Sequence, residues 1–454
     1  MLSMPNRVGA IAKKRGWPYY SAHPSLRSVL VVAVALWCAT VLPTTASAYS
    51  VLTHEEIVDM LWLDEIVPLL RQRFPTITDA QLKEAHAYAY GGAVLQDMGY
   101  YPFGSKQFSD MVHYVRSGDF VTEMVADARD PDEFAFALGA LSHYVSDVTG
   151  HPAVNRSVAI EYPELKRRFG PVVTYDEDMT AHLKTEFGFD VVQVAKQRYT
   201  FDQYHSFIGF EVSKPALERA FERVYGLKLE RVLKHEDLAI GTLRWSVSKV
   251  IPEMTKVALV TRGKQLAQER QDFSRNQFLY HVSRSDYERE WGTKYLRPGV
   301  GARMLAILLK LVPRVGPFKA LKYKDPTPQT EDLYYKSVDA TVNEYRQMLR
   351  AMRGSHTYRL RLQDRDLDTG AVTQRGEYPL SDETHAELAL ELRKEDASMP
   401  EDERRYLGGF FSAAAVERKS GTRKLWKKAD EAIRKLEAAG GVPMAESAAG
   451  RASN

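Results

Sequence analysis

The residues best suited to chemistry form an ordered series of histidines and carboxylates in the N-terminal half of the chain. The series consists of His54, Asp97, His113, His143, Asp147, His151, His182 and Glu186. Neutral imidazole nitrogens and carboxylate oxygens are typical zinc ligands, and one zinc ion takes about four of them. The series is therefore too large for one metal ion and sufficient for two or three.

Two pairs in this series have the spacing of neighbouring helical turns. His143 and Asp147 are four residues apart, as are His182 and Glu186. Residues at this spacing lie on one face of a helix, so each pair can present two ligands together. One such pair is common by chance, but two occur here and His151 follows the first pair by a further turn. Pro152 is expected to end that helix and place His151 at its end.

These residues must be positioned by a succession of helices, which we expect from residue 53 to about 260. Thr53 and Glu56 form a capping-box pattern, Asp79 is a candidate cap, and Pro131 opens a further helical pattern. Period-two alternation is scarce in this region, which favours a mainly α fold.

The character of the chain changes after about residue 265, where Arg and Lys become dense. We expect a strand over 357–362, where the sequence alternates with period two, and mostly helix over 381–394 and 402–436. The domain organisation predicted from these patterns is a signal peptide at 1–48, a catalytic domain at 49–262, an extension of unknown role at 263–436 and a disordered tail at 437–454.

The first 48 residues have the pattern of an export signal. Basic residues precede an apolar segment at 28–42, and Ala46-Ser47-Ala48 is a candidate cleavage site. The apolar segment is shorter than the roughly 20 residues needed to span a bilayer, so cleavage is favoured over an uncleaved anchor. The mature chain would begin at Tyr49 and be periplasmic or secreted. The single cysteine, Cys38, lies in the removed segment, which excludes a disulfide-linked partner.

Three weaker features leave the function open. The net charge of +3 over 454 residues indicates neither a nucleic-acid nor a membrane partner. The run 364–370 superficially resembles a calcium loop, but Arg375 stands where a bidentate Glu is needed, so a polar turn is favoured. The segment 304–312 is apolar with basic flanks and could contact a membrane surface, although a buried helix is favoured.

The order and spacing of the series resemble the zinc-dependent phospholipase C superfamily, which includes secreted single-strand-specific zinc nucleases. The run Gln96–Gly104 (QDMGYYPFG), followed by Met111-Val-His113-Tyr, matches that superfamily's Asp-then-His ligand pair. The five-residue step from Tyr49 to His54 is similar to the nuclease branch. Tyr49 replaces the usual Trp, but the expected ligand atoms there are its backbone amine and carbonyl. The resemblance covers Tyr49 to Glu186 by motif, extends to about 260 by helical pattern, and leaves out the C-terminal part.

The resemblance implies up to three zinc ions. One set of ligands would be Asp97, His113, His143 and Asp147. A second would be His151, His182 and Glu186 with a position open to water, and a third would be the Tyr49 backbone, His54 and a shared Asp147. The metals would activate a water molecule for attack on phosphorus, and Asp97 would be the catalytic residue that orients this water or takes its proton. Only three carboxylates offset the ions, so the pocket would favour an anionic phosphodiester.

The sequence thus predicts a mainly α, multi-helix zinc-dependent phospholipase C-like domain with a mostly helical C-terminal extension. The favoured activity is phospholipase C-like hydrolysis of a phospholipid or other phosphodiester. The alternative is a single-strand nuclease or nucleotidase with the same three zincs, and a second alternative is a non-catalytic, zinc-stabilised envelope protein. Near Asp97, the aromatic residues Tyr100, Tyr101 and Phe103 could line a substrate pocket or equally pack in the core.

Overall fold

The regular structure of the described residues is helical, which confirms the mainly α prediction. A computed structural model describes residues 51–195, 210–247, 251, 323–354, 359–395, 401–412, 427–429 and 431–435. Across these ranges the β pairing consists of one isolated bridge between Arg365 and Val372.

The described helices occur in two groups along the chain. The first group comprises α2 (Val51–Leu61), the π-helical turn η1 (Trp62–Ile66), α3 (Val67–Arg73), α4 (Asp79–Ala93), the 3-10 helix η2 (Gln96–Tyr100), α5 (Lys106–Tyr114), α6 (Ser117–Asp127), α7 (Pro131–Glu161), α8 (Pro163–Phe169), α9 (Met179–Ala195), α11 (Lys214–Tyr225), α12 (Leu229–Val232) and α13 (Glu236–Trp245). The second group comprises α17 (Pro328–Gly354), α18 (Pro379–Glu395) and α19 (Glu401–Ser412).

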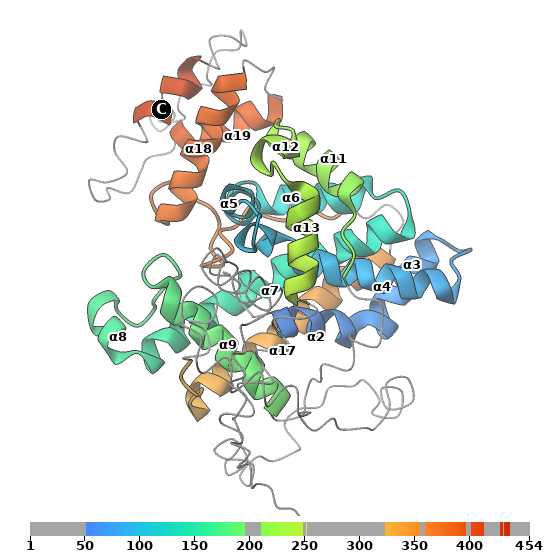
Figure 1. The fold of residues 1–454 in the computed structure, drawn as a ribbon, viewed down its shortest axis with the longest axis horizontal. Coiled ribbons are helices and arrows are strands. Elements are labelled where there is room, and N and C mark those ends of the chain that lie inside the picture. The colour runs from blue at the N-terminus through green and yellow to red at the C-terminus, as the bar shows by residue number, and fades with distance from the viewer. Residues whose placement is uncertain are drawn as a thin grey trace, which may run out of the picture. The chain divides into compact units, whose positions relative to one another are not determined.

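The long helix α7 is the common neighbour of α4, α6, α9 and α17 (Figure 1). Two glycines let α4 and α7 approach at backbone distance. A Cβ on Gly92 would lie 2.0 Å from the Phe136 carbonyl oxygen, and one on Gly139 would lie 2.1 Å from that of Ala89. No side chain fits in this space, so the two helices meet there only because both residues lack one. This crossing fixes α7, which carries three of the candidate ligands.

Helix α17 comes from the C-terminal extension and packs on α7 and α2. The Tyr345 hydroxyl donates to the Leu138 carbonyl at 2.8 Å, and the Tyr334 hydroxyl lies 2.7 Å from Thr53 Oγ1. Both tyrosines are fully buried. The extension therefore shares the hydrophobic core of the N-terminal helices. The expected boundary at 262/263 and the tail at 437–454 lie outside the described residues.

Pro152 does not end its helix, contrary to the prediction, because α7 continues to Glu161. A proline removes the N–H that would bond the carbonyl four residues earlier, which here belongs to Val148. That carbonyl faces Gly370, where a Cβ would lie 2.4 Å from its oxygen. Val154 and Val158 are fully buried beyond the proline, and their burial offsets the lost hydrogen bond.

Three other local predictions need correction. Helix α2 begins at Val51, and the Thr53 hydroxyl donates to Asp190 Oδ1 at 2.9 Å instead of capping a helix. Thr78, not Asp79, caps α4 through a complete capping box. The expected strand at 357–362 is absent over 359–362, where the chain has no regular structure, and 357–358 lie outside the described residues.

Among the described residues, no helix combines the length and the apolar character needed to cross a bilayer. The expected signal peptide at 1–48, Tyr49 and the apolar segment 304–312 all lie outside the described residues. The export signal and the membrane contact therefore stay predictions.

Candidate metal centre

Helix α7 presents His143, Asp147 and His151 from successive turns, and all three side chains are buried. The histidines are held by carbonyl groups from other elements. His143 Nδ1 donates to the Ala93 carbonyl at 2.9 Å, and His151 Nδ1 donates to the Leu367 carbonyl at 2.5 Å. A carbonyl can only accept, so the proton of each neutral ring is on Nδ1 and Nε2 keeps its lone pair.

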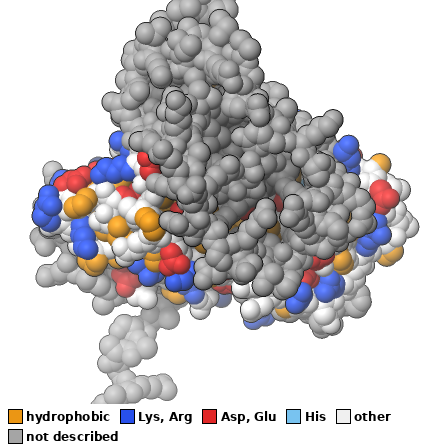
Figure 2. Space-filling view, turned by 90° about the horizontal axis from the view of Figure 1, so that it is seen from below, with side chains coloured by type: hydrophobic (Ala, Val, Ile, Leu, Met, Phe, Trp, Pro, Cys, Tyr) orange, Lys and Arg blue, Asp and Glu red, His pale blue; other side chains and the backbone are white. Residues whose placement is uncertain are grey.

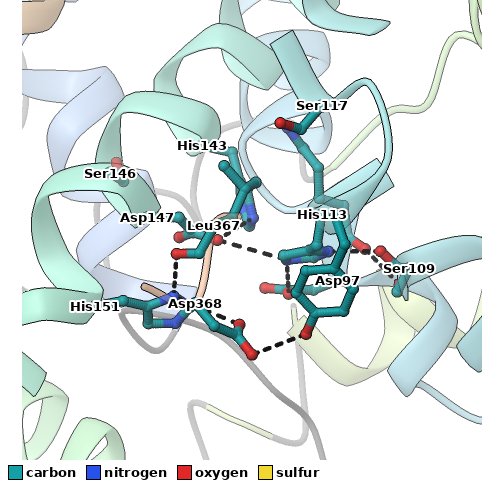
Figure 3. A network of polar contacts seen from close by, with 12 residues as sticks. Asp97, Ser109, His113, Ser117, His143, Ser146, Asp147, His151, Leu367 and Asp368 are labelled. Carbon is teal, nitrogen blue, oxygen red and sulfur yellow. Dashed lines mark hydrogen bonds and ion pairs between the residues drawn. The ribbon is translucent and has the colours of Figure 1, made fainter. Parts of the chain in front are cut away.

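Asp97 and His113 approach Asp147 from η2 and α5. His113 Nε2 lies 3.5 Å from Asp97 Oδ1 and 3.5 Å from Asp147 Oδ2. Its Nδ1 donates to the Ser109 carbonyl at 2.7 Å. The Ser109 hydroxyl accepts the Gly99 N–H at 2.8 Å and donates to the Gln96 carbonyl. Ser109 thereby ties α5 to η2, and so places His113 beside Asp97 (Figure 3).

His54 reaches the same carboxylate from α2. Its Nε2 lies 3.6 Å from Asp147 Oδ1, and its ring stacks on His143 with centroids 4.4 Å apart. His143 Nε2 lies 3.0 Å from Asp147 Oδ2. Asp147 is therefore shared by three histidines from three helices.

A separate group forms around His151, which lies one turn beyond Asp147 on α7. His182 and Glu186, both on α9, bring Nε2 and Oε1 to 2.7 Å from each other. The same Glu186 oxygen lies 3.7 Å from His151 Nε2. The pair His182 and Glu186 on α9 thus faces His151 on α7.

The ligand atoms form three groups, and within each group they lie within 4.8 Å of one another. The groups are His54 with His143 and Asp147, Asp97 with His113 and His143, and His151 with His182 and Glu186. All predicted ligand residues in the described ranges are thus brought together, with His143 common to two groups. Tyr49 lies outside the described residues.

The candidate ligand atoms are buried and make few hydrogen bonds, and this shows whether the site fits a metal ion. Within the described ranges, both carboxylate oxygens of Asp97 and Asp147, Nε2 of His143 and His151, both ring nitrogens of His182, and Oε1 of Glu186 are buried, and their close contacts with one another do not have hydrogen-bond geometry. Burying such groups unsatisfied costs several kcal/mol in order of magnitude. Nitrogen and oxygen donors that converge in this way match the ligand set of zinc, and coordination would offset that cost.

The electrostatics of the site divide the candidate ligands. Neighbouring carboxylates outweigh burial and raise the pKa of His113, His143 and His151, and burial raises the pKa of Glu186, so these four favour protonated forms that a metal would have to displace. Burial lowers the pKa of His182 to about 4 and places the pKa of His54 well below its ordinary value. Burial alone would raise the pKa of Asp147, but His143 and His113 outweigh it and hold this pKa well below its ordinary value. Metal ligands must be neutral imidazole and ionised carboxylate. Asp147, His54 and His182 already have these forms at neutral pH.

Two of the other histidines, His86 and His385, have core contacts. His86 Nε2 lies 2.9 Å from Asp59 Oδ1, and its ring stacks on Trp62 at 3.9 Å. The buried ring of His385 stacks on Phe410 at 3.7 Å. These contacts indicate structural roles for both histidines.

The aromatic residues near Asp97 divide into two kinds. Tyr100 and Tyr101 are buried, and the Tyr100 hydroxyl donates to Asp110 Oδ1 at 3.3 Å. Asp110 lies inside α5 and accepts this hydrogen bond. Phe103 is 41% exposed with a φ of 62°. The substrate-pocket role of these aromatics stays a prediction.

Sequence reasoning missed the contribution of the turn at 364–370. This stretch is the polar turn that was predicted, but Asp366 and Asp368 are buried. Leu367 and Asp368 lie between His113 and His151 (Figure 3). The repeated Asp was the only signal, and nothing local reveals a contact with residues more than 200 positions earlier.

The fold and the geometry define a helical protein with a buried, multi-site centre of histidine and carboxylate. Residues 53–233 match the family model described as zinc dependent phospholipase C. This match supports membership of the zinc-dependent phospholipase C family for the region that it covers. The match includes every candidate ligand from His54 to Glu186 and ends before α17 and the turn at 364–370. Comparisons with curated proteins and with solved structures gave no match.

Proposed function

We propose that the mature protein, from Tyr49 onward, is an exported zinc-dependent phosphodiester hydrolase that cleaves the glycerol–phosphate bond of a phospholipid. The observation that carries this proposal is the convergence of buried ligand atoms into three groups, two of which share His143. The groups lie within the region that matches the phospholipase C family. An inert structural zinc would need only one closed set of four ligands.

The proposed ligand sets are those that the resemblance implies, and the three groups and the contact between His113 and Asp147 support them. Asp97, His113, His143 and Asp147 would hold one zinc, and His151, His182 and Glu186 would hold a second. His54, Asp147 and the Tyr49 backbone would hold a third, once cleavage frees the Tyr49 amine. When bound, such ions supply an activated water and neutralise charge on the phosphoryl oxygens.

Asp97 is proposed as the residue that orients the attacking water or takes its proton. Its two oxygens are buried without hydrogen-bond partners, and Oδ1 lies 3.5 Å from His113 Nε2. A carboxylate acts as a general base only within hydrogen-bond reach of the proton that it removes.

The choice of a lipid over a nucleic acid is supported by the described surface. On the face shown in Figure 2, the described Lys and Arg side chains are interspersed with Asp and Glu. Proteins that track a nucleic-acid backbone present basic side chains clustered on one face. Exposed Phe103, six residues after Asp97, is an apolar group that a lipid surface could contact. The nuclease or nucleotidase alternative rests on the five-residue step from Tyr49 to His54.

The test assays protein beginning at Tyr49 on phosphatidylcholine vesicles and on single-stranded DNA in parallel, with and without a zinc chelator. Chelator-sensitive release of diacylglycerol is expected. Chelator-sensitive release of nucleotides would replace the lipid substrate by the alternative. Bound zinc with no hydrolysis of either substrate would contradict the enzymatic proposal and favour a structural envelope protein.

Export is tested separately. We expect protein recovered from the periplasm or the medium of a bacterial expression host to begin at Tyr49 by N-terminal sequencing. Recovery of the intact precursor in the membrane fraction would instead indicate an uncleaved anchor.

A further inference from the structure

The C-terminal extension reaches the centre through Leu367 and Asp368. These two residues lie beyond the family region, yet they contact the backbone of one candidate ligand and the ring of another (Figure 3). We propose that Asp368 is a positioning residue for the zinc ligands, and that the turn 364–370 completes a metal centre that the family region alone leaves unfinished. This inference rests on the proposed zinc centre.

The contact with His151 fixes which ring nitrogen is available for coordination. The Leu367 carbonyl accepts the Nδ1 proton at 2.5 Å, and Asp368 Oδ1 lies 3.6 Å from the same Nδ1. Nε2 is left facing Glu186 Oε1 at 3.7 Å. Hydrogen bonds of this kind set the tautomer and the orientation of a metal-binding histidine.

The Asp368 side chain is itself held firmly. Its Oδ2 accepts hydrogen bonds from the hydroxyls of Tyr114 at 2.8 Å and Tyr378 at 2.5 Å. Its backbone carbonyl accepts Nδ2 of Asn155, one turn beyond His151 on α7, at 2.8 Å. The residue is buried, so these contacts are not screened by bulk water. A carboxylate with two hydroxyl donors has one orientation available to it.

The same dipeptide also supports His113. The Leu367 N–H donates to the His113 carbonyl at 3.2 Å, and Tyr114, which donates to Asp368, is the next residue in α5. A change at Asp368 is therefore transmitted to α5 as well as to α7. His113 and His151 belong to different groups of candidate ligands, and the dipeptide links these two residues.

The turn is anchored outside the centre, as a positioning element requires. Asp364 Oδ1 accepts the backbone N–H groups of Gly118 and Asp119 at 3.1 Å each, at the start of α6. The Ser117 hydroxyl donates to the Arg365 carbonyl at 2.6 Å. Gly370, with a φ of 71°, touches the Val148 carbonyl where no side chain could fit. These contacts hold the turn on both sides of Leu367 and Asp368.

The test compares Asp368→Asn with the surface variant Asp332→Asn, which makes the same chemical change on an exposed part of α17. Asparagine keeps the shape but cannot offer a carboxylate to both tyrosines. We expect Asp368→Asn to weaken binding of one zinc by about 10- to 100-fold in competition with a chelator. The visible absorption of the cobalt-substituted protein should also change, since it reports ligand geometry. Asp332→Asn should leave both unchanged.

If Asp368 only stabilised the fold, Asp368→Asn should change neither the zinc affinity nor the cobalt spectrum. Unaltered zinc affinity and an unaltered cobalt spectrum in a folded Asp368→Asn protein would overturn the proposal. If that variant fails to fold, Tyr378→Phe removes a single donor and should still alter the cobalt spectrum; an unaltered spectrum there would equally overturn it. Wild-type protein that binds zinc but hydrolyses nothing would contradict the proposed function and not this inference, whereas wild-type protein that binds no zinc would overturn both.

Discussion

His143 Nε2 lies 3.0 Å from Asp147 Oδ2, with the two residues on adjacent turns of α7. Asp147 also faces Nε2 of His54 and of His113, at 3.6 Å and 3.5 Å. One carboxylate thus lies at the meeting point of two ligand groups. Substitutions at this residue and at the outlying His182 should therefore have different effects on metal content.

Asp147→Asn should abolish hydrolysis and lower the zinc content by more than one ion, because the carboxylate serves two groups. Elemental analysis of the purified mature protein measures the loss. Asp339→Asn is a suitable control on α17, and its zinc content should equal that of the wild type. Full zinc stoichiometry in folded Asp147→Asn protein would contradict the shared-ligand assignment.

His182→Ala should remove one zinc only. His182 contacts Glu186 at 2.7 Å and belongs to the group that does not contain Asp147. The remaining metal should stay bound, while hydrolysis falls by several orders of magnitude because the open coordination position is lost. Loss of all zinc from this variant would show that the groups are not independent.

The contact between α4 and α7 gives a prediction about stability. A Cβ at Gly139 would lie 2.1 Å from the Ala89 carbonyl oxygen, so Gly139→Ala must push the helices apart. Overpacking of this kind costs about 1–3 kcal/mol, and it should also lower zinc affinity by disturbing the His143 contact with Ala93. The free energy of unfolding from denaturant titration measures the first effect.

Gly241→Ala is the matched control for that variant. Gly241 lies in the helix α13, and a Cβ there would meet nothing within 4 Å. The change should stabilise the protein by about 0.5 kcal/mol, because alanine loses less backbone entropy than glycine. Equal destabilisation by the two alanines would rule out the close helix crossing as the cause.

Glu161 should make stability depend on pH. Burial raises the pKa of Glu161 to about 7 from an ordinary value of 4.5, and the hydrogen bond from Thr185 only partly opposes this. Between these pH values the folded state binds more protons than the unfolded state, so the group's contribution to stability falls as pH rises. Wild-type protein should lose up to about 3 kcal/mol relative to Glu161→Gln between pH 4.5 and pH 7.

Denaturant titrations of the two proteins at matched pH values provide the measurement. The metal centre is common to both, so its own pH dependence cancels in the difference. A wild-type-to-variant difference that stays constant from pH 4.5 to pH 7 would refute the raised pKa.

The ligand positions and the helical class could be predicted from sequence because they depend on short-range rules. Four-residue spacings place His143 beside Asp147 and His182 beside Glu186, whatever the rest of the fold does. The resemblance added Asp97 and His113, which lie on separate elements. The structure brings all of them together.

The failures have a different physical origin. Pro152 lies inside α7 because distant residues cover the helix after it, and Thr53 bonds Asp190 instead of capping. Asp368 reaches the centre only through tertiary packing of the extension. Local propensity is overridden in each case by contacts between residues far apart in sequence, and a single sequence does not display such contacts.

The central claim is that bound zinc in the family region hydrolyses a phosphodiester. The most direct measurement is the rate of phosphatidylcholine hydrolysis by protein beginning at Tyr49, before zinc removal, after removal verified by elemental analysis, and after zinc is restored. The account predicts that the rate falls to background on removal and returns on restoration. A rate that is unchanged in verified zinc-free protein would contradict it.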